Sequence, residues 1–428
     1  MTGLIGVDFG TTNSVVAILQ PDGNVRTTRY AVGSANLDVF RTLLCFWSEE
    51  GRGRHSLHHA AGPHAVEAYL DDPLDSRLIM SMKTYLAQHS FTQTRIFGRP
   101  FTLEQLVSLF LRSLLGPDHT GAQIVAGRPV RFAGEFADDA FGEERLRAAF
   151  AHAGFPDIEI ALEPEAAGYR IARTLDRPTV VLVGDFGGGT SDFSVARFAP
   201  HGAQRVVPLG YAGIGIAGDT FDYRIIDRVV SPVLGKGDVY TLMGKELPVP
   251  PEYFTAFARW HSLSMMRGPR TLRDIESVAA ASARPERLRA LIRLIEDEMG
   301  YPLYQAVSEV KAELSGSDAA TFRFAHGDFV IERRIDREEF EVWIADDLRR
   351  IAAAVDQALA NAGVPASAID RVFLTGGTSF VPAVRGLFER RFGTEKVSGG
   401  GEFVSVAEGL ALIGRDRVFG APNPVRNG

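Results

Sequence analysis

Residues Val183-Gly184-Asp185-Phe186-Gly187-Gly188-Gly189-Thr190-Ser191-Asp192 repeat the pattern of an earlier stretch, Ile5-Gly6-Val7-Asp8-Phe9-Gly10-Thr11-Thr12-Asn13-Ser14. In each stretch a short apolar segment ends in Asp and is followed by Phe-Gly and small hydroxyl residues. A second apolar segment comes next, at residues 15–19 and 193–196. The sequence therefore predicts the same β-hairpin twice.

Both predicted turns have the composition of a phosphate-binding loop. Glycine lets the backbone approach a ligand closely, because no Cβ stands in the way, so N–H groups and hydroxyls can surround phosphate oxygens. The Asp at the mouth of each turn can hold a hydrated Mg²⁺ ion. Two such turns in one chain suggest two half-molecules that bind one nucleotide from opposite sides.

The bulk composition is that of a globular protein with small-molecule or protein partners. The chain has 428 residues, of which 45% are hydrophobic and 23% charged, and its net charge is −7. This length predicts roughly two to four folding units, and the negative charge gives no reason to expect nucleic acid or an anionic membrane as a partner. The single cysteine, Cys45, excludes an internal disulfide, and no apolar run approaches the ~20 residues of a membrane-spanning helix. With no signal-like N-terminal segment, we expect a cytoplasmic protein.

Strands and helices alternate along the chain, which predicts an α/β fold. We expect helices at 102–111, 143–153, 340–362, 381–391 and 404–414 and strands at 123–127, 158–162 and 372–375. The Gly-, His- and Arg-rich residues 48–64 predict an exposed loop, and residues 219–334 a mostly helical insertion. Residues 421–428 are typical of a loose tail.

Five motifs carry a resemblance to a known family: Asp8-Phe9-Gly10-Thr11-Thr12-Asn13, Glu163-Pro164-Glu165-Ala166-Ala167-Gly168, Asp185-Phe186-Gly187-Gly188-Gly189-Thr190, Leu374-Thr375-Gly376-Gly377-Thr378 and Ala407-Glu408-Gly409-Leu410-Ala411. In order and spacing they resemble the nucleotide-binding domain of DnaK-type heat-shock chaperones, within the actin-like ATPase superfamily. The resemblance extends from Gly3 to about Arg415. Through Lys83 and the segments 127–132 and 311–315, the chain is most similar to the short YegD-like branch.

The resemblance implies an actin-like ATPase fold of two lobes, each with a mixed five-stranded-type sheet, flanking helices and one inserted subdomain. The first lobe would comprise residues 1–178, with its insertion at about 31–100, and would be completed by about 402–420. The second lobe would comprise residues 179–401, with its insertion at about 219–334. Residues 421–428 would form the tail.

The resemblance also implies roles for individual residues. Asp8 and Asp185 would hold Mg²⁺ through water, while Lys83, Glu163, Asp192 and Thr190 would serve hydrolysis, Lys83 by positioning the attacking water. ATP or ADP would be bound by residues of the turns and of later motifs: Gly10, Thr11, Thr12, Asn13, Gly187, Gly188, Gly189, Gly218, Lys311, Ser315, Gly376, Gly377, Thr378 and Phe380. Ala312 and Phe380 stand where family members present arginines to adenine, and Phe380 could stack on the base.

We expect a slowly hydrolysing ATPase that works as a nucleotide-driven, chaperone-like switch, with client or co-chaperone proteins as further partners. The family's peptide-binding domain has no counterpart in the sequence, so we expect the chain to act without one. Three alternatives stay open: a small-molecule kinase of the sugar-kinase type, an ATP-dependent scaffold that does not hydrolyse, and an actin-like filament former. Residues 213–218 also fit a dinucleotide fingerprint, which the interrupting Pro208 disfavours.

Overall fold

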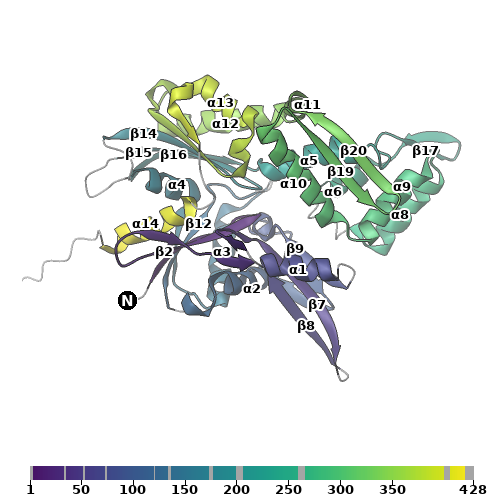
Figure 1. The fold of residues 1–428 in the computed structure, drawn as a ribbon, viewed down its shortest axis with the longest axis horizontal. Coiled ribbons are helices and arrows are strands. Elements are labelled where there is room, and N and C mark those ends of the chain that lie inside the picture. The colour runs from purple at the N-terminus through teal and green to yellow at the C-terminus, as the bar shows by residue number, and fades with distance from the viewer. Residues whose placement is uncertain are drawn as a thin grey trace, which may run out of the picture. The chain divides into compact units, whose positions relative to one another are not determined.

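The computed structural model describes residues 3–32, 35–51, 54–72, 75–119, 121–133, 136–172, 177–198, 206–258, 266–399 and 405–419. The predicted tail and the start of the final predicted helix lie outside these residues. The chain divides into two compact units. The first unit joins Met1–Gly218 to Arg349–Gly428, and the second comprises Asp219–Leu348. The predicted α/β class is confirmed (Figure 1).

The first sheet of the first unit contains the first glycine turn. Its strand order is β13-β12-β1-β2-β3, and β6 pairs with the other end of β2. The bounds are β1 (Leu4–Asp8), β2 (Asn13–Leu19), β3 (Val25–Thr27), β6 (Phe40–Arg41), β12 (Gln123–Arg128) and β13 (Ile158–Leu162). Strands β13, β12 and β1 are parallel, whereas β2 and β3 each pair antiparallel with their predecessor. The predicted strands of this sheet are confirmed.

The second sheet repeats this arrangement around the second glycine turn. Its order is β22-β21-β14-β15-β16, again with three parallel strands followed by two antiparallel ones. The bounds are β14 (Thr179–Phe186), β15 (Ser191–Phe198), β16 (Val206–Ile214), β21 (Arg371–Thr375) and β22 (Val397–Gly399). The two predicted hairpins are therefore confirmed, as β1–β2 and β14–β15. Strand β16 is antiparallel to β15 and lies at the sheet edge, where Pro208 is tolerated, so it is unlike the parallel strand of a dinucleotide-binding unit.

Two helices join the two sheets of the first unit. Helix α14 (Ser405–Phe419) packs on β1, β2 and β12, helix α4 (Glu163–Ala172) packs on β14 and β15, and the two helices pack on each other (Figure 1). Small residues allow this close approach. A Cβ on Gly409 would lie 1.7 Å from the Ala166 carbonyl oxygen, and one on Gly6 would lie 2.1 Å from that of Ala407. Helix packing thus holds the two glycine turns in one unit.

The predicted helix from Thr102 is confirmed as α2 (Leu103–Leu115), which begins with a capping box between Thr102 and Gln105. Helix α3 (Asp139–Ala153) ends at Gly154 as predicted but begins earlier, where the Asp138 side chain accepts a hydrogen bond from the Phe141 amide. Large apolar side chains of these helices, among them Phe110 and Phe150, are fully buried against the first sheet.

The predicted exposed loop at 48–64 is wrong. Most of it forms the hairpin β7 (Leu43–Gly51) and β8 (Arg54–Ala61), with β9 (Ser76–Met80) on the other side of β7 and α1 (Pro63–Asp71) following β8. Glycine and arginine predict a loop, but pairing with the apolar part of β7, where Cys45 and Phe46 are buried, imposes the extended conformation. Cys45 is a buried, free thiol, as expected.

The remaining elements of the first unit are short strands and helices: β4 (Tyr30–Val32), β5 (Ala35–Leu37), η1 (Met82–Tyr85), β10 (Gln93–Ile96), β11 (Arg99–Thr102), η2 (Pro117–His119), η5 (Ala366–Ala368), η6 (Gly377–Phe380), α13 (Pro382–Phe392) and η7 (Thr394–Lys396). The predicted helix after Gly376-Gly377 is confirmed as α13.

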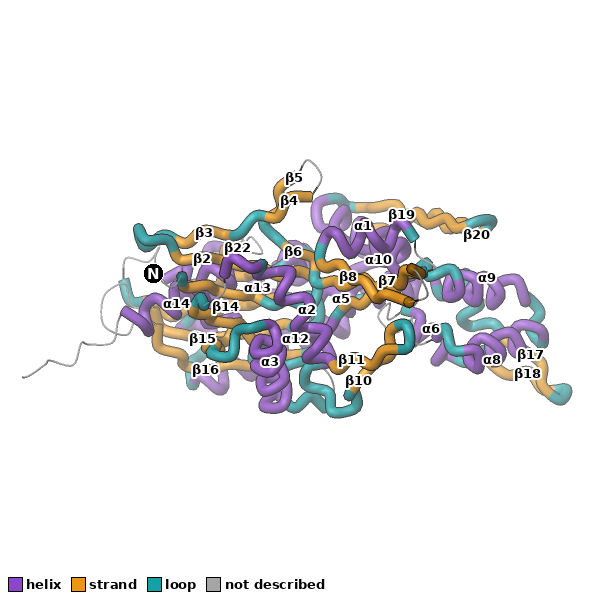
Figure 2. Tube along the Cα trace, turned by 90° about the horizontal axis from the view of Figure 1, so that it is seen from below, coloured by secondary structure: helices purple, strands orange, loops and turns teal. Residues whose placement is uncertain are grey.

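The second unit combines helices with two separate β-hairpins (Figure 2). Helix α5 begins one residue before the unit. The elements within the described residues are α5 (Gly218–Ile225), the π-turn η3 (Ile226–Val230), β17 (Val239–Leu242), β18 (Lys245–Pro248), α6 (Pro251–Phe257), α8 (Pro269–Ala280), α9 (Pro285–Glu296), α10 (Gly300–Gly316), β19 (Ala319–His326), β20 (Phe329–Asp336) and α11 (Arg337–Trp343). Among the residues described, no helix is both long and apolar enough to cross a membrane.

The predicted single helix at 340–362 is wrong in one respect. The segment is two helices, α11 and α12 (Ala345–Ala362), separated at Ile344, whose φ of −96° and ψ of 2° leave the helical region. Asp347 in the first turn of α12 accepts two hydrogen bonds from Arg224 of α5. This buried carboxylate suits a new helix N-terminus, where acidic groups are favoured.

Candidate functional site

The two glycine turns lie beside each other in the first unit. Gly10 is required for the first turn, because a Cβ there would lie 2.0 Å from the Asn13 carbonyl oxygen. A Cβ on Gly189, in the second turn, would lie 3.6 Å from the Thr11 hydroxyl of the first turn and 3.7 Å from the Thr84 hydroxyl. The structure therefore brings the two repeated motifs together at one place, and the space beside Gly189 is lined by hydroxyl groups.

A third glycine turn closes on the second. Gly376 has a φ of 85°, and a Cβ on it would lie 2.0 Å from the Phe186 carbonyl oxygen, so only glycine fits. In the parallel pairing of β14 with β21, Thr375 lies opposite Asp185. Of the other predicted nucleotide-binding residues, the Gly218 amide donates to the Gly187 carbonyl at 3.5 Å. Gly376, Gly187 and Gly218 thus surround the end of β14.

A buried ion pair lies at the carboxyl ends of the first sheet's strands. The Lys83 ammonium donates to Glu163 Oε1 at 2.6 Å, and the two side chains are only 8% and 6% exposed. Lys83 comes from η1, and Glu163 is the first residue of α4, directly after β13. Gly127 of β12 makes room for the carboxylate, since a Cβ there would lie 3.0 Å from Glu163 Cγ. Lys83 is therefore a buried, paired lysine rather than a solvated one.

Asp192 is held by the backbone of a neighbouring loop. Its Oδ1 accepts hydrogen bonds from the amides of Val130 at 2.9 Å and Arg131 at 3.3 Å. The Thr190 hydroxyl also donates to the carboxylate. Gly213 lies opposite Asp192 in β16, and a Cβ on it would lie 2.5 Å from Oδ1. Asp192 is thus buried and oriented, not an edge charge of the sheet.

Lys83 lies among four carboxylates, those of Asp8, Glu163, Asp185 and Asp192, and this imbalance of charge shifts the pKa values of the site. Burial and the neighbouring charge of Glu163 raise the pKa of Asp185 to about 8 and that of Asp192 to about 7. The same causes hold the pKa of Asp8 well above its ordinary value. Burial alone would lower the pKa of Lys83, but the charges of Glu163 and Asp8 outweigh it and raise that pKa. The site is therefore short of positive charge.

The residues present fit a hydrated magnesium ion and phosphate groups. A cation near Asp8 and Asp185 would relieve the mutual repulsion that raises their pKa values. No three His, Cys, Asp or Glu side chains in the described ranges converge closely enough to ligate a metal directly. A bound nucleotide would find backbone N–H groups of the glycine turns and the hydroxyls of their threonines as donors to its phosphate oxygens.

Comparison with known proteins gives one consistent result. Residues 292–416 match the Hsp70 protein family. The chaperone protein DnaK of Thermosipho africanus is 24% identical over 419 residues, covering 96% of this chain and 58% of the relative. DnaK of Thermotoga petrophila is 26% identical over 415 residues, with the same coverage. The chain thus spans about three fifths of the length of these relatives, and it is similar to the Hsp70 protein family over residues 292–416.

Other predicted site residues have local partners. Lys311 and Ser315 lie on α10 of the second unit, where the Lys311 ammonium is 2.7 Å from Asp222 Oδ1 and the Ser315 hydroxyl donates to the Lys311 carbonyl. Thr378 is buried in η6, whereas Phe380 is 53% exposed. The roles predicted for these residues and for Thr12, Asn13, Gly188 and Gly377 stay predictions.

The sequence reasoning missed several residues that shape the site. The amides of Val130 and Arg131 orient Asp192, Gly127 and Gly213 leave space for carboxylates, and Thr84 contributes a hydroxyl beside Gly189. The sequence held one signal for Gly127 and Gly213. A glycine near the end of a strand often marks a place where another group approaches the backbone closely. Arg145 of α3 pairs with Glu104 and donates to the Tyr85 carbonyl.

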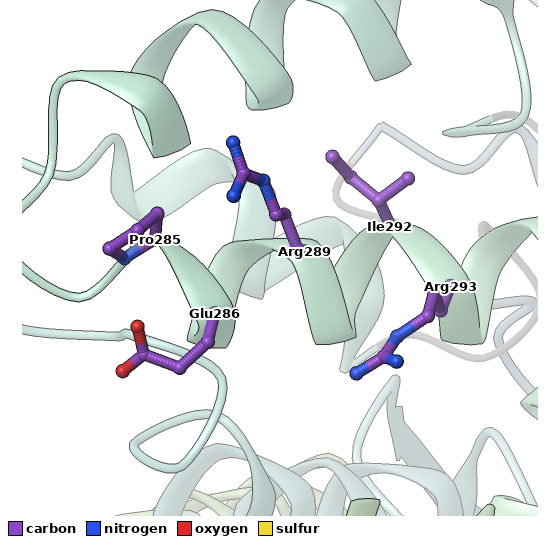
Figure 3. Close-up of a pocket in the computed structure, with 5 residues that line it drawn as sticks. All are labelled: Pro285, Glu286, Arg289, Ile292 and Arg293. Atoms are coloured by element: carbon purple, nitrogen blue, oxygen red, sulfur yellow. The ribbon is translucent and has the colours of Figure 1, made fainter. Parts of the chain in front are cut away.

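A surface hollow of about 480 Å³ lies along α9 in the second unit (Figure 3). It is lined by Pro285, Glu286, Arg289, Ile292 and Arg293. None of these residues is among the predicted site residues, and Arg289 pairs with Glu276 at 2.9 Å. We assign the hollow no role.

Proposed function

We propose that the chain binds Mg-ATP at the two glycine turns and hydrolyses it slowly, as a nucleotide-driven, chaperone-like switch. One observation carries the proposal: the two repeated turns meet beside Gly189, where a buried lysine and four carboxylates gather. The backbone N–H groups of glycine turns donate hydrogen bonds to phosphate oxygens. A site with more carboxylates than positive charges favours a divalent cation such as Mg²⁺. The similarity to DnaK chaperones supports the same conclusion.

In this proposal Asp8 and Asp185 hold the water shell of Mg²⁺, which would neutralise charge on the transferring phosphoryl group. Thr11 and the turn Gly187–Thr190 bind the phosphate oxygens. Lys83 would position the attacking water, and Glu163 keeps the ammonium in place through their 2.6 Å hydrogen bond. Asp192, fixed by two backbone amides, orients the water or the ion's hydration shell.

We extend the proposal to the architecture. The two sheets of equal strand order would be the cores of two lobes of an actin-like ATPase, with residues 219–334 as an insertion in the second. The chain would belong to the short YegD-like branch, act in the cytoplasm and work on client or co-chaperone proteins. Lobe closure on the nucleotide would be the bistable element of the switch.

A single-turnover ATP hydrolysis assay tests the proposal. We expect slow formation of ADP by the wild-type protein, loss of cleavage with retained nucleotide binding in Lys83→Ala, and loss of binding in Asp185→Ala. Lys236→Ala, which removes a lysine paired with Asp227 in the second unit, serves as a matched control with wild-type turnover. Tight binding of Mg-ATP without cleavage by the wild-type protein would contradict the mechanism.

The same experiment separates the alternatives. A kinase would consume ATP only when an acceptor is added, so a panel of sugar-type acceptors is run alongside water. A scaffold would bind ATP without turnover, and Lys83→Ala would then leave the negligible rate unchanged. A filament former would sediment in the presence of ATP. Acceptor-independent turnover without sedimentation supports the proposed ATPase.

A further inference from the structure

The hydroxyl of Thr84 is buried and makes no hydrogen bond within the part of the chain that the structure describes. The backbone amide and carbonyl of Thr84 are both hydrogen-bonded. The Thr84 amide donates to the Ser81 carbonyl at 3.0 Å, and its carbonyl accepts from the Gln88 side chain at 3.0 Å. A buried hydroxyl without a partner is costly, so such a group in a folded site calls for an explanation.

The location of the Thr84 hydroxyl explains why it has no partner in the described residues. Thr84 follows Lys83 in the short helix η1, and its hydroxyl lies on the same side of Gly189 as the Thr11 hydroxyl. A methyl group added to Gly189 would touch both hydroxyls and, at 3.8 Å, the Ala133 side chain. The Thr84 hydroxyl therefore faces the space beside Gly189, between the two glycine turns.

The backbone before this helix is held in an unfavourable conformation. Ser81 has a φ of 51° and a ψ of 32°, in the left-handed region that residues other than glycine rarely adopt. Ser81 is itself buried. Strain of this kind persists where the surrounding structure requires a defined geometry, and it is found most often at functional sites. Here it starts the turn that carries both Lys83 and Thr84.

We propose that Thr84 is a nucleotide-binding residue whose hydroxyl donates a hydrogen bond to the terminal phosphate of bound ATP. This inference rests on the proposed function and adds a residue that neither the sequence motifs nor the comparisons assign. Because ADP lacks that phosphate, the hydroxyl distinguishes ATP from ADP. Lys83 and Thr84 are adjacent in one helix. In this proposal the Lys83 ammonium interacts with the terminal phosphate through its charge, and the Thr84 hydroxyl through a hydrogen bond.

The test is calorimetric titration of Mg-ADP and of a non-hydrolysable Mg-ATP analogue into the wild-type protein and three variants, namely Thr84→Val, Thr84→Ser and the control Thr28→Val. Thr84→Val keeps the side-chain shape and removes the hydroxyl, whereas Thr84→Ser keeps the hydroxyl. We expect Thr84→Val to weaken analogue binding about 10-fold or more, the usual contribution of a hydrogen bond to a charged group. ADP affinity should be unchanged, and Thr84→Ser should restore analogue binding.

Thr28→Val is the matched control. The Thr28 hydroxyl is also buried without a partner in the described residues, but it follows β3, where its amide donates to the Val16 carbonyl. This variant should bind both nucleotides as the wild type does. A merely structural role for Thr84 would show as a lowered melting temperature of Thr84→Val, whereas we expect it to be unchanged or raised.

The outcomes separate this inference from the proposed function. If the wild-type protein binds neither nucleotide, the proposed function fails. If the wild type binds both and Thr84→Val binds the ATP analogue equally well, or loses ADP affinity to the same extent, the role of Thr84 is overturned and the proposed function stands.

Discussion

Replacing Lys83 by methionine removes the single lysine from a cluster of four carboxylates. The Lys83–Glu163 pair is 2.6 Å long and under 10% exposed at both ends. Removing one partner of such a pair leaves a charge buried without compensation, which costs about 3–5 kcal/mol. We therefore expect Lys83→Met to lower the free energy of unfolding of the ligand-free protein by about this amount at pH 8.

The loss should depend on pH in a defined direction. The pKa of Lys83 is raised in the folded protein, so its stabilising contribution is complete below its ordinary pKa, near 10.5, and is lost only as pH rises above that value. Throughout pH 5–8 the wild-type lysine is charged. In the variant the carboxylates can instead take up a proton as pH falls, which relieves the repulsion. The cost of Lys83→Met should therefore shrink from pH 8 to pH 5.5.

Urea denaturation of the wild type and Lys83→Met at both pH values measures this effect. Two controls bracket it. Lys236→Met breaks the more exposed pair with Asp227 and should cost only about 1 kcal/mol. The double variant Lys83→Met with Glu163→Gln removes the uncompensated charge together with its partner and should recover part of the loss. Equal stability of Lys83→Met and wild type at pH 8 would show that the Lys83 ammonium does not compensate these buried carboxylates.

Three further predictions concern a buried carboxylate, a glycine turn and a glycine at a helix contact. The pKa of Asp192, about 7, lies above its ordinary value, so the folded protein keeps a proton that the unfolded chain releases, and stability falls as pH rises from about 4 to about 7. Asp192→Asn should remove this group's slope, at most about 1.4 kcal/mol per pH unit, when melting temperatures are measured without Mg²⁺; an unchanged slope contradicts the assignment. Gly189→Ala meets nothing closer than 3.6 Å and should change stability by less than about 1 kcal/mol while weakening nucleotide binding. Gly409→Ala, which meets the Ala166 carbonyl at 1.7 Å, should cost about 3 kcal/mol or more by urea denaturation, and the reverse ranking would count against the packing described.

The hairpins were predictable because their signal is local. Asp8 and Asp185 each end a run of apolar residues and precede a glycine turn, and both properties can be seen in consecutive residues. The strand β8 was not predictable, since its Arg- and His-rich sequence becomes extended only by pairing with β7. The break at Ile344 lies next to the pair between Asp347 and Arg224 of α5, two residues that are 123 positions apart in the sequence.

The site was predictable only in part for the same reason. Lys83 and Glu163 are 80 residues apart, and nothing in the local sequence of either indicates that they meet. Their pairing could be expected only from the resemblance to a family. The support that Asp192 receives from the Val130 and Arg131 amides comes from backbone, which leaves no trace in residue identity. Thr84 is a common residue in a short helix, and only the three-dimensional structure reveals that its hydroxyl has no hydrogen-bond partner among the described residues.

In the proposed function the two repeated turns together form one Mg-nucleotide site. Calorimetric titration of Mg-ATP into the wild-type protein, repeated with excess EDTA and with Asp8→Ala and Asp185→Ala, tests it most directly. We expect one site per chain that is lost or greatly weakened in all three cases, because each turn contributes one carboxylate to the same ion. Undetectable binding by the wild-type protein, or binding that survives EDTA and both substitutions, would contradict it.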